Sequence, residues 1–156
     1  MFAAFLFESA TFINCARPIL IGVMDTGIKV GECMQSSLVK IKDSASVFDA
    51  ARKMKDSNIG SLLVEDSKVY GIVTADDIVF KAVATRKMDS SVKDLLSKPL
   101  ISVSMDADLA EAARIMGEKD VKRLVVKSGQ KIVGIVSQKD IIRISPSLYG
   151  VIAKRE

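Results

Sequence analysis

The sequence predicts an α+β fold made of two similar β-α-β-β-α units. The first observation is a phrase that occurs twice: GIVTADDI, at residues 71–78, returns 63 residues later as GIVSQKDI, at 134–141. The second is that the similarity extends upstream at an offset of 62, so that residues 30–80 resemble 92–143. The third is that short strand-like segments alternate with helices that are apolar on one face. A repeat of this length indicates two copies of one structural unit.

Each unit opens with a short extended segment, at 39–41 and 101–103. A helix follows, because apolar residues recur at the i, i+3, i+4, i+7 spacing of a one-sided helix. These positions are Val47, Ala50, Ala51 and Met54 in the first unit and Leu109, Ala112, Ala113 and Met116 in the second. Ser46-x-x-Asp49 and Asp108-x-x-Glu111 predict capping boxes at the two helix starts.

Two strands and a tight polar turn complete each sheet. The predicted hairpins join residues 62–65 to 68–73 and 124–127 to 131–136. The repeated phrase marks the point where the second strand gives way to a final helix, and Pro146 ends the last of these helices. Because the helices cover one face of each sheet, the other face needs a partner, which the second copy supplies.

The composition restricts the chemistry that the chain can perform. It has 156 residues, a net charge of +4 and no histidine, which excludes Ser-His-Asp catalysis, histidine metal sites and a histidine pH switch. Cys15 and Cys33 form no Cys-x-x-Cys pair, so we expect neither a zinc site nor a disulfide scaffold, and a cytoplasmic location. Aromatic residues make up only 5%, with none stacked beside basic clusters, so nucleic-acid binding is not expected.

Residues 1–23 form an apolar extension that precedes the repeat. Its start is not basic, and Glu8 and Pro18 interrupt it, so neither a signal peptide nor a membrane anchor is predicted. An over-extended reading frame with the natural start at Met24 is an alternative. The predicted boundaries are a first unit at 24–88, a second at 89–145 and a tail at 146–156.

The repeated phrase has a structural and a functional interpretation. Thr74-x-x-Asp77 and Ser137-x-x-Asp140 match the capping box, in which the hydroxyl and the acid bond the first amides of a helix. In the functional interpretation, a helix start after a strand offers N–H groups and a hydroxyl to a phosphate. A carboxylate one turn later can accept two hydrogen bonds from a ribose diol. The spacing leaves both interpretations open.

The same residues resemble a known family. The repeated phrase resembles the end of the sequence pattern of the CBS domain, named after cystathionine β-synthase. This pattern ends with glycine, two hydrophobic residues, Thr or Ser, two further residues, Asp and a hydrophobic residue. The segments 50–54 and 112–116 (AARKM, AARIM) are similar to that family, as are Leu62–Val64 and Leu124–Val126. Val30 and Val92, which introduce the units, are similar too. The resemblance covers about 115 of the 156 residues, in tandem.

The resemblance implies two units packed with pseudo-twofold symmetry and two clefts between them, which commonly bind AMP, ADP, ATP or S-adenosylmethionine. It assigns ribose contacts to Asp77 and Asp140 and phosphate contacts to Thr74 and Ser137. Ile41 is a candidate for a backbone contact with adenine, although a core strand position is the stronger interpretation.

The resemblance also places phosphate-holding basic residues just before the first hairpin strand, with adenine near the apolar residue that precedes them. The second unit has Val121, Lys122 and Arg123 at these positions, and the first has Ile59, Gly60 and Ser61. Since an arginine can bind phosphate through two nitrogens, we expect the cleft with Ser137 and Asp140 to be the primary site. Gly60 leaves room where Lys122 would intrude. A solvated surface pair is the alternative for the two cations.

The sequence therefore predicts a stand-alone regulatory module that binds an adenosine-containing ligand, requires no cofactor and signals to a partner protein that the sequence does not identify. The resemblance also implies a homodimer. A protein-interaction module with vestigial clefts is the alternative. An enzyme is not expected, because the only candidates for catalysis are the Asp and Ser residues that the repeat already uses.

Overall fold

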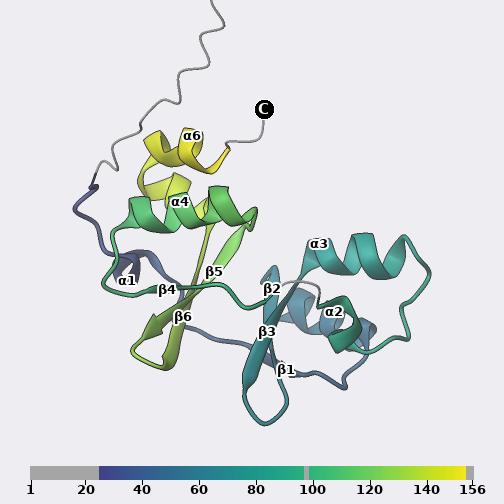
Figure 1. The fold of residues 1–156 in the computed structure, drawn as a ribbon. Coiled ribbons are helices and arrows are strands. Elements are labelled where there is room, and N and C mark those ends of the chain that lie inside the picture. Colours follow the sequence, from purple (N-terminus) through teal and green to yellow (C-terminus); the bar gives the residue numbers. More distant parts are fainter. Residues whose placement is uncertain (1–24, 97–98, 154–156) are drawn as a thin grey trace, which may run out of the picture.

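The chain folds into two three-stranded sheets, each covered on one face by helices (Figure 1). This is a computed structural model, and it describes residues 25–96 and 99–153. The predicted extension at 1–23 lies outside the described residues. Within the described ranges, no helix is long and apolar enough to cross a membrane.

In the first unit, β1 pairs in parallel with β2, and β2 pairs in antiparallel with β3. The elements are β1 (Lys40–Lys42), α2 (Val47–Asp56), β2 (Ser61–Glu65), β3 (Val69–Thr74), the one-turn α3 (Ala75–Asp77) and the π-helix η1 (Ile78–Val83). The predicted order β-α-β-β-α is confirmed. The switch to a π-helix after one turn was not predicted; such segments occur frequently at functional sites.

The second unit repeats this arrangement with the strand order β4-β5-β6. Its elements are β4 (Ser102–Ser104), α4 (Leu109–Lys119), β5 (Arg123–Ser128), β6 (Lys131–Ser137) and α5 (Gln138–Ile144), followed by η3 (Pro146–Leu148) and α6 (Tyr149–Ile152). Helix α5 ends before Pro146, as predicted, and the proline starts η3 because its fixed φ suits a first helical position.

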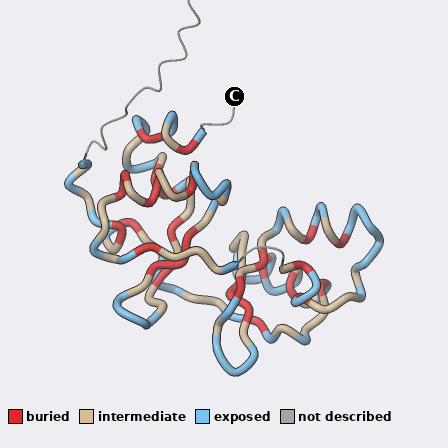
Figure 2. Tube along the Cα trace, in the orientation of Figure 1, coloured by how far each residue is buried: buried red, intermediate tan, exposed pale blue. Residues whose placement is uncertain are grey.

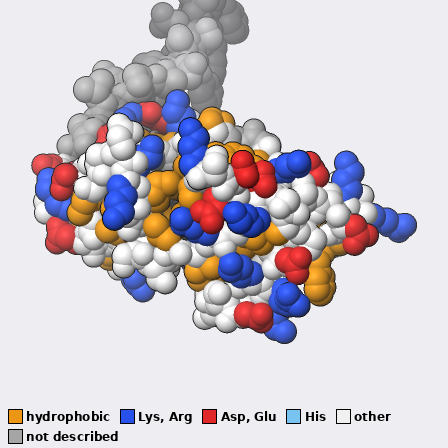
Figure 3. All heavy atoms as spheres, turned by 90° about the horizontal axis from the view of Figure 1, so that it is seen from below, with side chains coloured by type: hydrophobic (Ala, Val, Ile, Leu, Met, Phe, Trp, Pro, Cys, Tyr) orange, Lys and Arg blue, Asp and Glu red, His pale blue; other side chains and the backbone are white. Residues whose placement is uncertain are grey.

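The two hairpins share the same register and the same irregularity. Ser61 faces Thr74 in one sheet, and Arg123 faces Ser137 in the other. Each second strand shows a register shift at the same point of the repeat, after Val64 and after Val126. Both hairpins end on one side of the molecule, the side seen in Figure 3, where basic and acidic side chains alternate with hydrophobic ones.

The segment that introduces each unit packs against the other unit. Helix α1 (Val30–Cys33) belongs to the core of the second unit, whereas the short 3-10 helix η2 (Val92–Leu95) belongs to the core of the first. The backbone bonds are equivalent: the Val30 amide donates to Ala107 O at 2.9 Å, and the Val92 amide donates to Ala45 O at 2.9 Å. The two units therefore exchange equivalent segments, as the predicted pseudo-twofold symmetry requires.

Two glycines of the repeated phrase make room for the exchanged segments. A Cβ added at Gly71 would lie 2.6 Å from Leu96 Cδ1, and one added at Gly134 would lie 2.4 Å from Met34 Sδ. The phrase therefore needs its glycine for packing between units as well as for any ligand. Two separate hydrophobic clusters form the cores, and Figure 2 shows their buried residues along the strands and the facing sides of the helices.

The units differ in how their helices are covered. In the second unit α6 packs on α4, and Gly117 permits this because a Cβ there would lie 2.5 Å from Val151 O. In the first unit the corresponding helices expose large hydrophobic side chains. These are Phe48 (60% exposed), Val79 (52%), Phe80 (70%) and Val83 (53%).

Candidate functional site

Thr74 and Asp77 form the predicted capping box at the end of β3. The Thr74 hydroxyl donates to Asp77 Oδ2 at 2.6 Å, and the Thr74 amide donates to the same oxygen at 3.0 Å. In return, the Asp77 amide donates to the Thr74 hydroxyl at 3.2 Å. Ser137 and Asp140 make the same three bonds at 2.6, 3.0 and 3.3 Å. The structural interpretation of the phrase is therefore confirmed in both units.

A cleft of about 410 Å³ lies between the units, next to the first of these boxes. Its polar wall carries Thr74 and Asp77 from the first unit and Lys122 and Arg123 from the second. Its apolar wall includes Ile72, Ile101, Val121 and Val125. A volume of this size is within the usual range for small-molecule sites, which are mostly apolar with a few converging polar groups.

Lys122 closes one edge of the cleft with an ion pair between units. Its Nζ lies 2.7 Å from Asp76 Oδ2, and the hydrogen bond from Lys122 lowers the pKa of that carboxyl. Both side chains are more than half exposed, so this ion pair contributes little to stability. Lys122 can therefore leave Asp76 for another anion at small cost.

Of the cations that line the cleft, Arg123 indicates most clearly what kind of ligand the cleft could bind. Its guanidinium lies over Gly60, where an added Cβ would be 2.7 Å from Nη2. Burial lowers the pKa of Arg123, against the opposing effect of Asp76, Asp140 and Asp77. Among the described residues it makes no hydrogen bond and no ion pair. A half-buried arginine without an anion is costly, which points to a ligand with negative charge.

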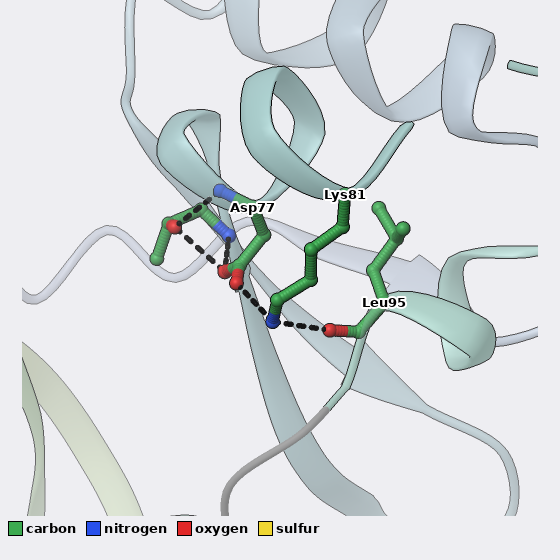
Figure 4. Close-up of polar contacts among 4 residues, drawn as sticks. Asp77, Lys81 and Leu95 are labelled. Carbon is green, nitrogen blue, oxygen red and sulfur yellow. Dashed lines mark hydrogen bonds and ion pairs between the residues drawn. The ribbon is translucent and has the colours of Figure 1, made fainter. Parts of the chain in front are cut away.

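Lys81 is a cleft residue that the sequence analysis missed. Its Nζ contacts Asp77 Oδ1 at 2.5 Å and donates to Leu95 O at 2.8 Å (Figure 4). The sequence signal for this ion pair is the i, i+4 spacing of opposite charges on one helix. A comparison of the two copies does not reveal this signal, because the residue of the second unit that corresponds to Lys81 is Ile144. Lys81 binds one oxygen of Asp77, and Thr74 binds the other.

The second box is less accessible. The Asp140 side chain is 9% exposed, compared with 23% for Asp77. Helix α1 packs on α5, and Arg143 lies 3.8 Å from Asp140 Oδ1. Burial raises the pKa of the nearby Cys33 thiol, and the charges of Glu32 and Asp140 raise it further.

The structure places the two predicted cations beside the first box. Lys122 and Arg123 were expected to complete the cleft of Ser137 and Asp140, and both line the cleft of Thr74 and Asp77. The physical reason is the packing between units: β5 presents its first residues to the other unit, where Lys122 meets Asp76. We therefore regard the Asp77 cleft as the candidate site.

The remaining predicted site residues divide between the cleft and the core. Val121 lines the Asp77 cleft together with Lys122 and Arg123. Gly60 contacts the cleft through Arg123, and its carbonyl accepts from the Ala75 amide at 3.1 Å. Ile59 packs against the first core cluster, and Ile41 is 7% exposed within it. Ile41 is therefore a core strand residue outside this cleft, whereas Ile101, the residue just before β4, lines it.

No group of three or more Cys, Asp or Glu side chains that could hold a metal ion occurs in the described part of the chain. The fold and the cleft define a duplicated α+β module whose two units jointly build one ligand-sized site. A comparison with known protein families matches the CBS domain twice, over residues 30–83 and 92–147. The chain belongs to the CBS-domain family and contains a tandem pair of these domains.

Individual relatives agree with this assignment. An uncharacterised protein of Methanopyrus kandleri is 32% identical over 130 residues, which cover 80% of this chain and 66% of that protein. The chain thus spans about two thirds of the length of this relative. A crystal structure of an uncharacterised Pyrococcus horikoshii protein has a TM-score of 0.71 and 30% identity, over 78% of this chain and 95% of that one. A hexameric CBS-CP12 protein from bloom-forming cyanobacteria has a TM-score of 0.69 and 32% identity, over 74% and 69%.

Proposed function

We propose that this CBS pair is a regulatory module that binds an adenosine phosphate in the Asp77 cleft. The observation that carries the proposal is Arg123 at the junction of the two units, a half-buried guanidinium that forms no ion pair within the described part of the chain. A phosphate offers oxygens to two guanidinium nitrogens at once. Lys122, at the edge of the cleft, adds a second positive charge.

The other walls suit the rest of such a ligand. Asp77 is the carboxylate that would accept hydrogen bonds from the ribose diol, in exchange for its present bond to Lys81. The apolar side chains of Ile72, Ile101 and Val125 offer a surface to the adenine ring. Small-molecule sites typically combine such a surface with a few placed polar groups.

The charges of the cleft favour a ligand with few phosphates. Three cations line it, namely Lys81, Lys122 and Arg123, and three acids balance them, namely Asp76, Asp77 and Asp120. We expect AMP or ADP to bind more tightly than ATP, whose further phosphates would meet these acids. S-adenosylmethionine has no phosphate for Arg123 and should bind more weakly still.

Binding can be transmitted because both units contribute to the cleft. A ligand that contacts Asp77 on one unit and Arg123 on the other stabilises the arrangement of units in which both contacts exist. The difference in affinity between arrangements limits how far the ligand shifts their balance. The receiver of the signal would be another polypeptide.

The test is calorimetric titration with AMP, ADP, ATP and S-adenosylmethionine, followed by Asp77→Ala and Asp140→Ala. Both variants lose the same capping bonds, so Asp140→Ala controls for the loss of a helix cap. We expect Asp77→Ala to weaken AMP binding by about 10- to 100-fold, the value of hydrogen bonds to a charged group. Asp140→Ala should bind as the wild type does. An equal loss in both variants, or no heat with any ligand at millimolar concentration, would contradict the proposal.

A role in self-assembly is a second candidate, supported by the exposed hydrophobic residues of the first unit. The corresponding helix of the second unit carries Ala110 in place of Phe48, and its cluster includes residues of η3 and α6. The fold thus covers this helical face in one unit and leaves it open in the other. We propose that the first units of two chains cover one another in a homodimer. The hexameric cyanobacterial relative supports association between copies in this family.

A further inference from the structure

A second hollow lies away from the Asp77 cleft, between the ends of the two hairpins. Its volume is about 650 Å³, and four lysines line it: Lys40, Lys68, Lys127 and Lys131. No acidic residue is among its lining residues. We propose that this hollow binds a polyphosphate group. The proposal does not depend on the ligand of the Asp77 cleft.

The position of the hollow follows from the symmetry of the pair. Lys68 and Lys131 occupy corresponding places in the two hairpin turns, 63 residues apart. Leu38 and Leu100 occupy corresponding places in the segments that lead into β1 and β4, 62 residues apart. Each unit therefore contributes the same two wall residues, so the hollow is formed by equivalent parts of the two pseudo-symmetric units. A ligand with negative charge at several points along its length can contact both units.

The two units differ in how they neutralise the remaining lysines. Lys40 lies 3.0 Å from Glu65 Oε2. The corresponding pair in the second unit is Ser102 and Lys127, because the repeat has serine in place of lysine and lysine in place of glutamate. Lys127 is consequently a half-buried cation without an acid. Among the described residues, Lys68 and Lys131 likewise make no ion pair.

A polyphosphate fits these features better than a single phosphate does. The three lysines without an ion pair come from two hairpins and provide separate positive charges rather than one two-pronged arginine contact. Each lysine ammonium group can form a charge-assisted hydrogen bond with a phosphate oxygen. Because the three ammonium groups are separate, a ligand that contacts all of them needs several phosphates. The hollow has the size of a small-molecule site, so the ligand is either a short inorganic polyphosphate or a polyphosphorylated small molecule.

The test is calorimetric titration at low salt with two probes, inorganic tripolyphosphate and inositol hexakisphosphate. The double variant Lys127→Ala/Lys131→Ala should weaken binding of at least one probe by about tenfold or more, since each lost bond to a charged group has a large effect. The stronger probe identifies the class of ligand. The variant should still fold, because both side chains lie outside the two hydrophobic clusters.

The control is Lys55→Ala/Lys119→Ala, which removes the same charge from exposed residues of α2 and α4 outside the hollow. It should bind both probes as the wild type does, and so should Asp77→Ala. An equal loss in the control would show general electrostatic attraction and overturn the proposal. Binding unchanged in the hollow variant, or no binding of either probe at millimolar concentration, would overturn it too.

Discussion

Arg123 shows how one residue links two units and a ligand. It starts β5 in the second unit, and its guanidinium lies over Gly60 of the first unit. The neighbouring Lys122 carbonyl accepts from the Gln138 amide at 3.0 Å, just as the Gly60 carbonyl accepts from Ala75. The backbone is therefore symmetric at this point while the side chains are not. Gly60 provides the space that Arg123 uses.

The first prediction concerns Gly60→Ala. The added Cβ would lie 2.7 Å from Arg123 Nη2, so the guanidinium must move. Because it is the end of a flexible side chain, the cost in unfolding free energy should be less than about 1 kcal/mol. The affinity for AMP should fall by about tenfold, because the phosphate contact is displaced. Thermal unfolding and calorimetric titration measure the two effects separately.

Gly150→Ala serves as the control, because a Cβ there meets nothing within 4 Å. It should leave ligand affinity unchanged. If Gly60→Ala also binds AMP normally, Arg123 does not contact the ligand. A large loss of stability in Gly60→Ala would show instead that the guanidinium is fixed by the fold.

At the scale of elements, the segment before α1 is held by Asp108, the N-cap residue of α4. Asp108 accepts hydrogen bonds from the Ala110 amide at 2.8 Å, from the Thr26 amide at 3.1 Å and from the Gly27 amide at 2.9 Å. One carboxylate thus caps a helix and fixes the chain that leads into α1. The corresponding cap in the first unit, Ser46, accepts only from Asp49 within its own helix.

The second prediction concerns the dependence of stability on pH. Burial alone would raise the pKa of Asp108, but the hydrogen bonds that it accepts from Ala110 and Thr26 favour the ionised form, and the pKa lies well below its ordinary value of 3.8. A carboxyl with a lowered folded-state pKa stabilises the fold above its ordinary pKa, and this contribution is lost as the pH falls below that value. Asp108→Asn keeps one accepting oxygen but replaces Oδ2, which accepts from the Gly27 amide, so it should cost about 1 kcal/mol at neutral pH, the typical value of one hydrogen bond.

The difference in unfolding free energy between wild type and Asp108→Asn should shrink as the pH falls below about 4. Denaturant unfolding at several pH values measures it. Asp106→Asn, an exposed residue of the same turn, is the control and should have little effect at any pH. A difference that stays constant down to pH 2 would show that Asp108 acts through shape and not through its charge.

The elements were predictable from the sequence to different degrees. The strands, the helix caps Ser46 and Asp108 and the two-unit plan follow from short-range patterns. The predicted capping box of Asp108 and Glu111 is not formed, because Asp108 accepts from Ala110 and Glu111 pairs with Arg114. The exchange of α1 and η2 could not be predicted, because a four-residue helix carries no signal of the unit on which it packs. The resemblance assigned Arg123 to the cleft of Asp140 because both belong to the second unit; that the guanidinium also lies over Gly60 of the first unit depends on packing between units. Lys81 was hidden because only one copy has it.

At the scale of the whole molecule, the departures from symmetry coincide with the proposed functions. The Asp77 cleft has Lys81 and Arg123, whereas their counterparts are Ile144 and Ser61. In the lysine hollow, Lys127 stands where the first unit has Glu65, and it forms no ion pair with any residue that the structure describes. The C-terminal helix α6 covers the helices of one unit only. The duplicated fold therefore supplies the scaffold, and the substitutions between copies supply the specificity.

The last prediction concerns the open helical face. Phe48 and Val83 are 60% and 53% exposed, on helices α2 and η1, which contact each other. Large exposed hydrophobic groups on neighbouring elements mark an interaction surface. If two first units cover one another, a glutamate at Val83 would place a charge in an apolar interface, next to its own symmetric copy in a twofold dimer. We expect Val83→Glu to be monomeric and the wild type dimeric by light scattering at the same concentration.

Tyr149→Glu is the matched control, because Tyr149 is 61% exposed but belongs to α6 of the second unit. It should remain dimeric. Val83 does not line the Asp77 cleft, so Val83→Glu should still bind AMP, which separates loss of the interface from loss of the fold. A dimer that persists in Val83→Glu but dissociates in Tyr149→Glu would place the interface on the second unit. In that case α6 would be the contact between copies, and the open face of the first unit would have to serve a different protein.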